Sequence, residues 1–263
     1  MPQAAQLADW LLARGRTAVT TAEAAEILHV PPGQVRVRMN SAVHAGRMFS
    51  PSRGLWVAIP PKYRMWGAPP AVEFLDPLMT HLDREYYVGW LSAAEIHGAA
   101  HQRPQALQIA VDRPVQDRSF GRAHLRFTQR SRAGELPRQR HNVESGHIWV
   151  STPDLTAVDL VDQPDLSGGL SNIATVLFEL AESAALDPAN LARLAATFSA
   201  TSVRRLGYLL RFVDAPVDTT TLERVVKAAP LPRPAVLDPR LPRQGVTDPT
   251  WDIVVNTVVE PDL

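Results

Sequence analysis

Cysteine is absent from this 263-residue sequence, and lysine is nearly absent, because only Lys62 and Lys227 occur among 27 basic residues. Without cysteine there is no disulfide, no thiolate zinc site and no cysteine nucleophile. No apolar run approaches the roughly 18 residues of a membrane-spanning helix. Residues 1–13 also lack the basic start and apolar centre of an export signal. We therefore expect a soluble, cytoplasmic protein.

The motifs of several common enzyme classes are also missing. The sequence contains no GxxxxGKS/T phosphate loop, no GxGxxG that opens a helix after a strand, and no GxSxG nucleophile turn. A metal-dependent nuclease needs acidic side chains on a strand with a lysine nearby. Asp112 follows a predicted strand at 107–111, but its neighbour is Arg113. We expect a protein that is not an enzyme and needs no cofactor, with a metal-dependent nuclease as the alternative.

Glu95, His97 and His101 cluster in the sequence and are residue types that bind metals. His97 and His101 are four residues apart, a spacing that brings two side chains to the same side of a helix. Gly98 weakens a helix between them, and Glu95 does not stand where the HExxH zinc motif requires it. Packing roles are therefore favoured, and we predict no metal site.

The net charge of zero conceals an uneven distribution along the chain. Residues 1–70 carry eight basic and three acidic side chains, whereas residues 149–263 carry nine basic and fifteen acidic ones. A second basic stretch lies within residues 103–140. A basic beginning and an acidic end suggest that the first part of the chain meets a polyanion such as nucleic acid.

The first 60 residues predict three helices followed by two strands. Thr20 and Glu23 have the spacing of a capping box before the second helix, and Gly46 suits the end of the third. Residues 51–54, Pro-Ser-Arg-Gly, form a turn between the strands. This order is that of a winged helix-turn-helix, which predicts a DNA-binding domain over residues 1–62. The expected helices are 4–13, 22–28 and 32–45, and the expected strands are 48–49 and 55–59.

The third predicted helix has one apolar side and one polar side. The side chains expected to face the core are Val35, Met39, Ala42 and Val43. The side chains expected to face DNA base edges are Gln34, Val37, Asn40 and Ser41. Glutamine and asparagine pair with adenine, and an exposed valine can meet the methyl group of thymine. Arg36 and Arg38 flank this side and suit phosphates, and Arg53 in the turn suits phosphate or the minor groove.

A linker over residues 63–75 and a larger domain over residues 76–263 are expected next. Gly67 to Pro70 is rich in glycine and proline, which favours the linker. Ser92 is expected to cap a helix that ends at Ala99, and Thr152 is expected to cap a later helix with Pro153 at its first position. The larger domain shows strand patterns first, at 107–111, 125–128 and 148–151, and a last one at 251–259. Its predicted helices are 154–161, 170–184, 190–198 and 202–212. The whole chain is therefore assigned to the α+β class, a winged helix-turn-helix followed by a mixed α+β domain.

A possible second basic surface is predicted on the helix over 202–212. Arg204, Tyr208 and Arg211 share one side at helical spacing, and Arg205 adds a charge beside them. This surface could contact DNA, an RNA-like substrate or an acidic protein, or it could be a solvated side of a helix with no partner. The basic stretch 103–140 leaves the same alternatives open.

Several segments together resemble the AbiEi-type antitoxins of bacterial abortive-infection toxin–antitoxin systems. They occur in the family's order and cover nearly the whole chain. The segments are RGLWVAIP at 53–60, YVGWLSAAEIHGA at 87–99, WVSTPDLTAVDL at 149–160, RRLGYLL at 204–210, and WDIVVN at 251–256 with Glu260 and Asp262.

The resemblance implies two roles for the chain. The N-terminal domain would bind inverted repeats in double-stranded promoter DNA and repress its own transcription. The C-terminal domain would counteract a cognate nucleotidyltransferase-like toxin, without requiring a stable complex. A protein-docking adaptor that does not bind DNA is the remaining alternative, because winged helices also serve as protein-docking modules.

Overall fold

A computed structural model describes residues 3–99, 104–183 and 186–263. The chain divides into two compact units, each made of several segments. Unit 1 consists of Met1–Val88, Gln105–Glu135 and Gln139–Val150, and unit 2 consists of Gly89–Pro104, Leu136–Arg138 and Ser151–Leu263. These units do not follow the predicted boundary, because the segment predicted as a linker lies inside unit 1 and holds regular structure.

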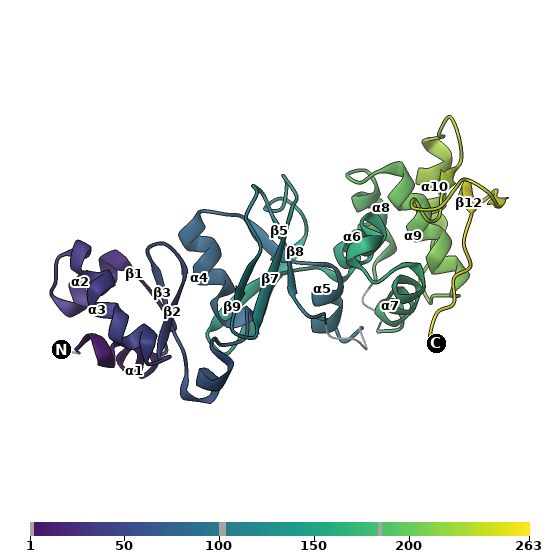
Figure 1. Cartoon of the computed structure of the whole chain (residues 1–263). Helices are drawn as coiled ribbons and strands as arrows, with labels where there is room; N and C mark the ends of the chain where they lie inside the picture. The colour runs from purple at the N-terminus through teal and green to yellow at the C-terminus, as the bar shows by residue number, and fades with distance from the viewer. Residues whose placement is uncertain (1–2, 100–103, 184–185) are drawn as a thin grey trace. The chain divides into compact units, whose positions relative to one another are not determined.

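Unit 1 begins with an N-terminal module, residues 3–60, whose elements have the predicted order (Figure 1). Strand β1, which the sequence did not predict, adds to the hairpin so that the antiparallel sheet has the order β1-β3-β2. The elements are η1 (Ala4–Gln6), α1 (Leu7–Leu12), β1 (Ala18–Thr20), α2 (Thr21–Leu28), α3 (Pro32–His44), β2 (Met48–Ser52) and β3 (Leu55–Ala58). Apart from β1, these elements follow the order that the sequence analysis predicted for a winged helix-turn-helix.

The start of α2 shows how the sequence specifies this module. The Thr20 hydroxyl accepts a hydrogen bond from the Glu23 backbone N–H at 3.2 Å, and the Glu23 carboxylate accepts one from the Thr20 N–H at 2.8 Å. This capping box was predicted and is confirmed. Burial of apolar side chains from all three helices then closes the core, which includes Leu7, Leu11, Val19, Val35, Met39, Met48 and Trp56.

The rest of unit 1 is a six-stranded sheet of order β6-β7-β5-β4-β9-β8, preceded by η2 and α4. Within it β5 runs parallel to β7 and antiparallel to β4, while β4 and β9 are parallel. The elements are η2 (Pro61–Trp66), α4 (Val72–Leu82), β4 (Tyr86–Val88), β5 (Leu107–Val111), β6 (Arg118–Phe120), β7 (Ala123–Gln129), β8 (Arg138–Val143) and β9 (Gly146–Ser151).

Helix α4 begins within the last four residues of the expected linker and continues beyond it, and it contains Pro77. Proline has no N–H, so the carbonyl four residues earlier, that of Glu73, loses its helical partner. The Ser145 hydroxyl donates to this carbonyl at 2.7 Å, and the Glu73 carboxylate accepts the Ser145 N–H at 2.8 Å. The Tyr86 hydroxyl also donates to Asp76 at 2.9 Å. Contacts with the sheet therefore stabilise a helix that its proline disfavours.

Unit 2 is mainly helical, with a small sheet of order β10-β12-β11. Its elements are α5 (Trp90–Ile96), α6 (Pro153–Asp162), η3 (Pro164–Leu166), α7 (Leu170–Glu182), α8 (Pro188–Ala195), α9 (Ala200–Phe212), α10 (Thr220–Ala228), β10 (Ala235–Val236), β11 (Val246–Asp248) and β12 (Ile253–Val255). Helix α6 contacts α5, α7, α8 and α9 and is buried from Asp154 to Val161. It is therefore the centre of this unit.

Two predicted caps in unit 2 have different outcomes. Thr152 caps α6 with Pro153 in the first turn, as predicted. Ser92 does not cap α5, because that helix already begins at Trp90 after Gly89, and Ser92 is buried within it. The predicted order of strands followed by helices is confirmed, and the chain is of the α+β class.

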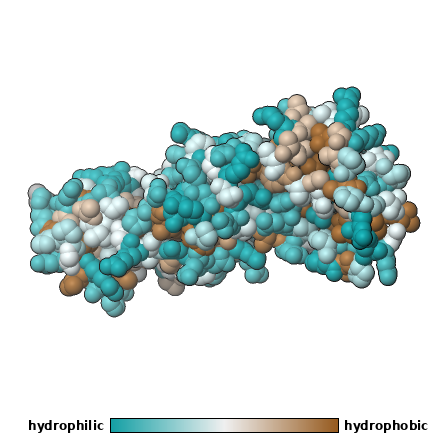
Figure 2. Space-filling view, turned by 90° about the horizontal axis from the view of Figure 1, so that it is seen from above, coloured by the Kyte–Doolittle hydropathy of each residue, from teal (hydrophilic) through white to brown (hydrophobic). Residues whose placement is uncertain are grey.

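The surface of the described residues is largely polar. On the face shown in Figure 2, hydrophilic residues predominate. Few large hydrophobic side chains are exposed, and one of them, Val37, lies on α3. Across residues 3–99, 104–183 and 186–263, no helix is long and apolar enough to cross a membrane.

Candidate nucleic-acid interface

Helix α3 presents the predicted set of polar side chains to solvent. Val35, Met39 and Ala42 are buried in the core of the N-terminal module. The six side chains predicted to contact DNA from this helix are all exposed, and they are Gln34, Arg36, Val37, Arg38, Asn40 and Ser41. Val37 is 70% exposed, so its methyl groups are accessible to a binding partner.

One predicted core residue of α3 is placed differently. Val43 is 38% exposed rather than buried. An α-helix turns by about 100° per residue, so residue 43 lies about 80° away from Val35 around the helix axis. The buried positions 35, 39 and 42 span about 60° around that axis, and residue 43 lies about 40° beyond Met39 at one side of them. Val43 therefore stands at the edge of the apolar side, and its predicted core position is corrected.

An open groove of about 920 Å³ runs beside α3. Its walls come from the N-terminal residues 3–5, the end of α2 and α3 itself. Four of the predicted DNA-contacting residues line it: Gln34, Val37, Arg38 and Ser41. Arg36 and Asn40 are exposed outside it. The structure thus brings an amide, a hydroxyl, an apolar side chain and a guanidinium to one concave surface.

The exposed arginines at positions 36, 38 and 53 differ from three other arginines of unit 1 that pair with carboxylates. Arg16 pairs with Glu23 at 2.5 Å, and Arg47 and Arg64 pair with Asp9 at 3.6 and 3.2 Å. Among the described residues, by contrast, Arg36, Arg38 and Arg53 have no acidic partner. Their charge is therefore available to an anion such as a phosphate.

The polar side chains of α3 are also largely free to bind. Within the described chain, the side-chain amides of Gln34 and Asn40 form no hydrogen bond. The Ser41 hydroxyl donates to the Arg38 carbonyl only at 3.5 Å, which is long for a hydrogen bond. His44 Nδ1 donates to the Asn40 backbone carbonyl at 2.7 Å, which leaves the Asn40 side chain unaffected.

The turn between β2 and β3 is attached to the rest of unit 1. The backbone carbonyl of Arg53 accepts a hydrogen bond from His81 Nε2 of α4 at 2.9 Å, and that of Pro51 accepts one from Arg118 of β6. The Arg53 side chain remains exposed. Sequence reasoning missed these contacts, because no local pattern links residues 53, 81 and 118.

The predicted second basic surface is wrong for two of its four residues. Arg204 and Arg205 are only 1% and 3% exposed. Arg204 donates to the carbonyls of Ala200 at 3.1 Å and Ala229 at 2.7 Å, and its Nε lies 3.6 Å from Asp252. Burial lowers the pKa of Arg204, and the nearby Asp252 opposes that change. Its role is to satisfy main-chain acceptors within unit 2.

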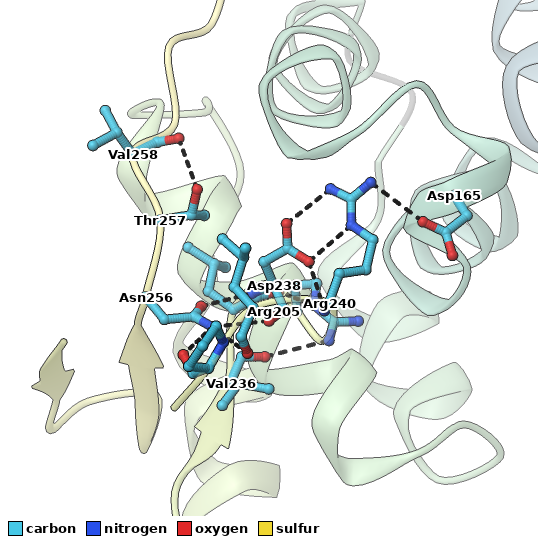
Figure 3. Close-up of polar contacts among 11 residues, drawn as sticks. Asp165, Arg205, Val236, Asp238, Arg240, Asn256, Thr257 and Val258 are labelled. Carbon is cyan, nitrogen blue, oxygen red and sulfur yellow. Dashed lines mark hydrogen bonds and ion pairs between the residues drawn. The ribbon is translucent and has the colours of Figure 1, made fainter. Parts of the chain in front are cut away.

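Arg205 joins α9 to two other parts of unit 2, and Figure 3 shows it beside one of them, the segment at Val236 and Asp238. Its Nη1 donates to the Val161 carbonyl at 2.6 Å, and its Nε donates to the Leu237 carbonyl at 2.7 Å. Burial lowers the pKa of Arg205, while Asp162 and Asp238 raise it. Asp238 in turn binds Arg240 at 2.8 Å. Tertiary contacts, rather than the pattern on α9, place this arginine inside the protein.

Tyr208 and Arg211 stay at or near the surface. The Tyr208 ring stacks on that of Phe212 with their centroids 6.0 Å apart, and Arg211 donates to the Thr250 hydroxyl at 3.1 Å. These two residues do not form a strongly basic surface without Arg204 and Arg205.

Several arginines of the basic stretch 103–140 form ion pairs or lie over aromatic rings within the protein. Arg113 pairs with Asp83 and Asp112, each at 3.1 Å, and Arg132 pairs with Glu135 at 2.7 Å. The guanidinium groups of two others lie over tryptophan rings, Arg122 over Trp66 and Arg140 over Trp149. The number of arginines in this stretch is therefore larger than the number that could bind an external anion.

His97, which was considered as a metal ligand, and the buried Asp154 both have structural contacts. His97 Nε2 bonds to the Ser151 carbonyl at 2.8 Å, and His101 lies outside the described residues. Buried Asp154 accepts the Asp187 N–H at 2.7 Å and the Asn190 amide at 3.1 Å, and burial raises the pKa of Asp154. In the part of the chain that the structure describes, no group of three or more His, Cys, Asp or Glu residues could hold a metal.

The fold resembles one solved by crystallography. The RV2827C protein from Mycobacterium tuberculosis matches with a TM-score of 0.69 over 97% of this chain and 92% of that chain, at 16% sequence identity. At this identity the likeness shows a shared fold only. No curated protein is significantly similar to the chain.

Residues 87–212 match the family model of the AbiEi antitoxin C-terminal domain. The matched segment runs from β4 to the end of α9 and includes three of the segments that carried the resemblance in the sequence. It does not include the N-terminal module. The match confirms the predicted resemblance to the AbiEi-type antitoxin family over residues 87–212 of this chain.

Proposed function

We propose that the chain is an antitoxin that also represses its own promoter by binding double-stranded DNA through α3. The observation that carries the DNA-binding half is the set of exposed side chains on one side of α3, with arginines that lack acidic partners. Elsewhere in unit 1, the arginines at 16, 47 and 64 are paired with carboxylates. Unpaired arginines at the edge of a polar helix surface suit a phosphate backbone.

The residues have separate roles in this proposal. Gln34, Asn40 and Ser41 read base edges in the major groove, and Val37 contacts a thymine methyl group. The phosphate contacts are made by Arg36, Arg38 and Arg53. The operator is an inverted repeat, with one copy of the chain on each half-site.

The charge of the two units supports the same assignment. Unit 1 contains 16 Arg and Lys residues against 11 Asp and Glu, while unit 2 contains 11 against 16. The excess of positive charge is therefore in the unit that holds α3, where it favours approach to DNA. The acidic unit 2 is repelled by DNA.

The antitoxin half rests on the AbiEi antitoxin domain at residues 87–212. We propose that its target is a nucleotidyltransferase-like toxin encoded beside it, counteracted in the cytoplasm without a requirement for a stable complex. The chain itself performs no catalysis in this proposal. The toxin should stop growth when it is expressed from an unrelated promoter, and coexpression of the chain should restore growth. Because repression cannot act on an unrelated promoter, unrestored growth would contradict the antitoxin half.

Binding of the purified protein to its own upstream DNA tests the repressor half. Fluorescence anisotropy with unlabelled competitor DNA should show selective, salt-sensitive binding. Asn40→Ala should reduce the preference for the operator over competitor by about 1–3 kcal/mol, because an adenine contact is lost. Arg233→Gln is the matched control, since Arg233 is an exposed, unpaired arginine of unit 2. Absence of selective binding would favour a protein-docking role for α3 instead.

A further inference from the structure

The β2–β3 hairpin is held at two backbone carbonyls, one at the end of β2 and one in the turn, by side chains from outside the N-terminal module. His81 is in the last turn of α4, and its Nε2 lies 2.9 Å from the Arg53 oxygen. A carbonyl only accepts hydrogen bonds, so the proton must be on Nε2. Arg118 of β6 donates to the Pro51 carbonyl, two residues before Arg53.

Packing supports these two hydrogen bonds. The Phe49 ring of β2 lies 5.2 Å from both Phe74 of α4 and Phe120 of β6, measured between ring centroids. At Gly54, where φ is +89°, a Cβ atom would lie 3.3 Å from His81 Cε1, so the imidazole rests against the turn itself. The hairpin is therefore fixed by α4 and β6 along its length rather than projecting freely.

Apart from its hydrogen bond to the Pro51 carbonyl, the Arg118 side chain has few polar contacts that would hold it in place. Its Nε is buried without a hydrogen-bond partner among the described residues, and burial lowers the pKa of this arginine. No carboxylate pairs with it in the described chain. The bond to the Pro51 carbonyl is therefore the contact that its guanidinium makes, which points to the turn as the reason for its placement.

We propose that His81 and Arg118 are positioning residues for DNA binding, which fix the turn backbone so that the Arg53 side chain is directed at DNA. The six-stranded sheet and α4 thereby become part of the DNA-reading unit. The physical gain is preorganisation, because a turn that is already ordered loses less conformational entropy when it binds. This inference rests on the proposed DNA-binding function, and its experiment separates the two.

The first measurement needs no DNA. Hydrogen–deuterium exchange of the peptide spanning residues 51–55 in the full-length protein reports the order of the turn. His81→Phe keeps an aromatic ring but removes the donor, and Arg118→Met keeps the apolar stem. Both should exchange faster than the wild type, His81→Gln should restore slow exchange because it retains an N–H donor, and the neighbouring control Thr80→Ala should change nothing. Unchanged exchange in His81→Phe and Arg118→Met would overturn the proposal.

The second measurement is a double-mutant cycle on operator affinity. His81→Phe should weaken binding roughly two- to tenfold, the range expected when one immobilised side chain must be ordered on binding. In an Arg53→Ala background, the same substitution should cost nothing further, because its effect acts through Arg53. An equal loss in both backgrounds would show a general structural effect and overturn the positioning role.

A comparison with α3 distinguishes failure of this inference from failure of the proposed function. If Arg53→Ala binds DNA like the wild type while Arg38→Gln binds weakly, His81 and Arg118 do not position a DNA contact, yet DNA binding by α3 stands. If the wild-type protein shows no selective binding, the proposed function itself is wrong. Weakened DNA binding by Arg53→Ala, together with no further loss from His81→Phe in that background, supports both the DNA-binding function and the positioning role of His81.

Discussion

Two pairs of arginines, on helices of equal length, differ in their exposure to solvent and in their bonding partners. Helices α3 and α9 each have 13 residues, and each carries two arginines within three positions, at 36 and 38 and at 204 and 205. Arg36 and Arg38 are exposed without acidic partners in the described chain, whereas Arg204 and Arg205 are buried and bonded to carbonyls. The same residue type is exposed and unpaired in one place and is bonded within the fold in the other.

The surroundings of each helix explain the difference. Helix α3 buries one narrow side, at Val35, Met39 and Ala42, so the rest of its circumference faces solvent. Helix α9 is buried almost continuously from Ser202 to Leu210. An arginine there must find acceptors inside the protein, and the carbonyls at the end of α10 and beside β10 provide them. A pair of arginines therefore indicates a basic surface only when other parts of the protein bury a single side of the helix and leave the arginines on the exposed side.

The largest expected effect comes from removing one buried arginine. Arg205→Met leaves the carbonyls of Val161, Val236 and Leu237 without their donor. Each unsatisfied buried acceptor costs about 1–3 kcal/mol, so unfolding free energy should fall by about 3 kcal/mol or more. Urea unfolding followed by circular dichroism measures it. Arg38→Met is the matched control on α3 and should change stability by less than about 0.5 kcal/mol. Equal losses for both variants would contradict the comparison.

Replacing a glycine by alanine should change the stability of the protein in opposite directions on these two helices. A Cβ atom at Gly207 of α9 would lie 2.0 Å from Trp251 Cζ3, whereas one at Gly33 of α3 would have no atom within 4 Å. Gly207→Ala should therefore destabilise the protein by about 1–3 kcal/mol through overpacking. Gly33→Ala should stabilise it by up to about 1 kcal/mol, because alanine favours a helix. Thermal unfolding distinguishes them, and a stabilised Gly207→Ala variant would mean that α9 is not tightly enclosed.

The smallest expected effect concerns pH and the capping box. Burial alone would raise the pKa of Glu23, but hydrogen bonds from Thr20 and Arg16 outweigh it and hold the pKa below its ordinary value of 4.5. A carboxyl with a lowered pKa stabilises the fold above its ordinary pKa and loses that contribution as pH falls. The stability difference between wild type and Glu23→Gln should therefore shrink between pH 7 and pH 3. Urea midpoints across this range measure it, and a constant difference would exclude the carboxylate as the cause.

The sequence predicted the elements whose signals are local. The capping pairs at Thr20 and Thr152 and the polar side of α3 required only nearby residues. Helix α4 was missed because Pro77 and the Gly-Ala-Pro-Pro segment before it argue against a helix. Its apolar positions 74, 75, 78 and 79 have helical spacing and are the signal that was available.

Non-local contacts account for the errors in the candidate site. Nothing near Arg204 and Arg205 in the sequence reveals the carbonyls that hold them, which lie 22 or more residues away in the sequence for Val226, Ala229 and Leu237. The attachment of the β2–β3 turn to His81 and Arg118 spans 28 and 67 residues. Exposure of a charged side chain depends on which distant segment covers its helix, and helical periodicity carries no such information.

The central claim is that the unpaired arginines of α3 bind the phosphate backbone of DNA. The most direct test is the salt dependence of binding to the protein's own upstream DNA, for the wild type, Arg36→Gln/Arg38→Gln and the control Arg233→Gln. Each lost phosphate contact should reduce the slope of log K against log salt by about 0.9, so the double variant should lose roughly 1.8 and the control nothing. Equal slopes and equal affinities for all three proteins would contradict the account, because the exposed charge of α3 would then have no part in DNA binding.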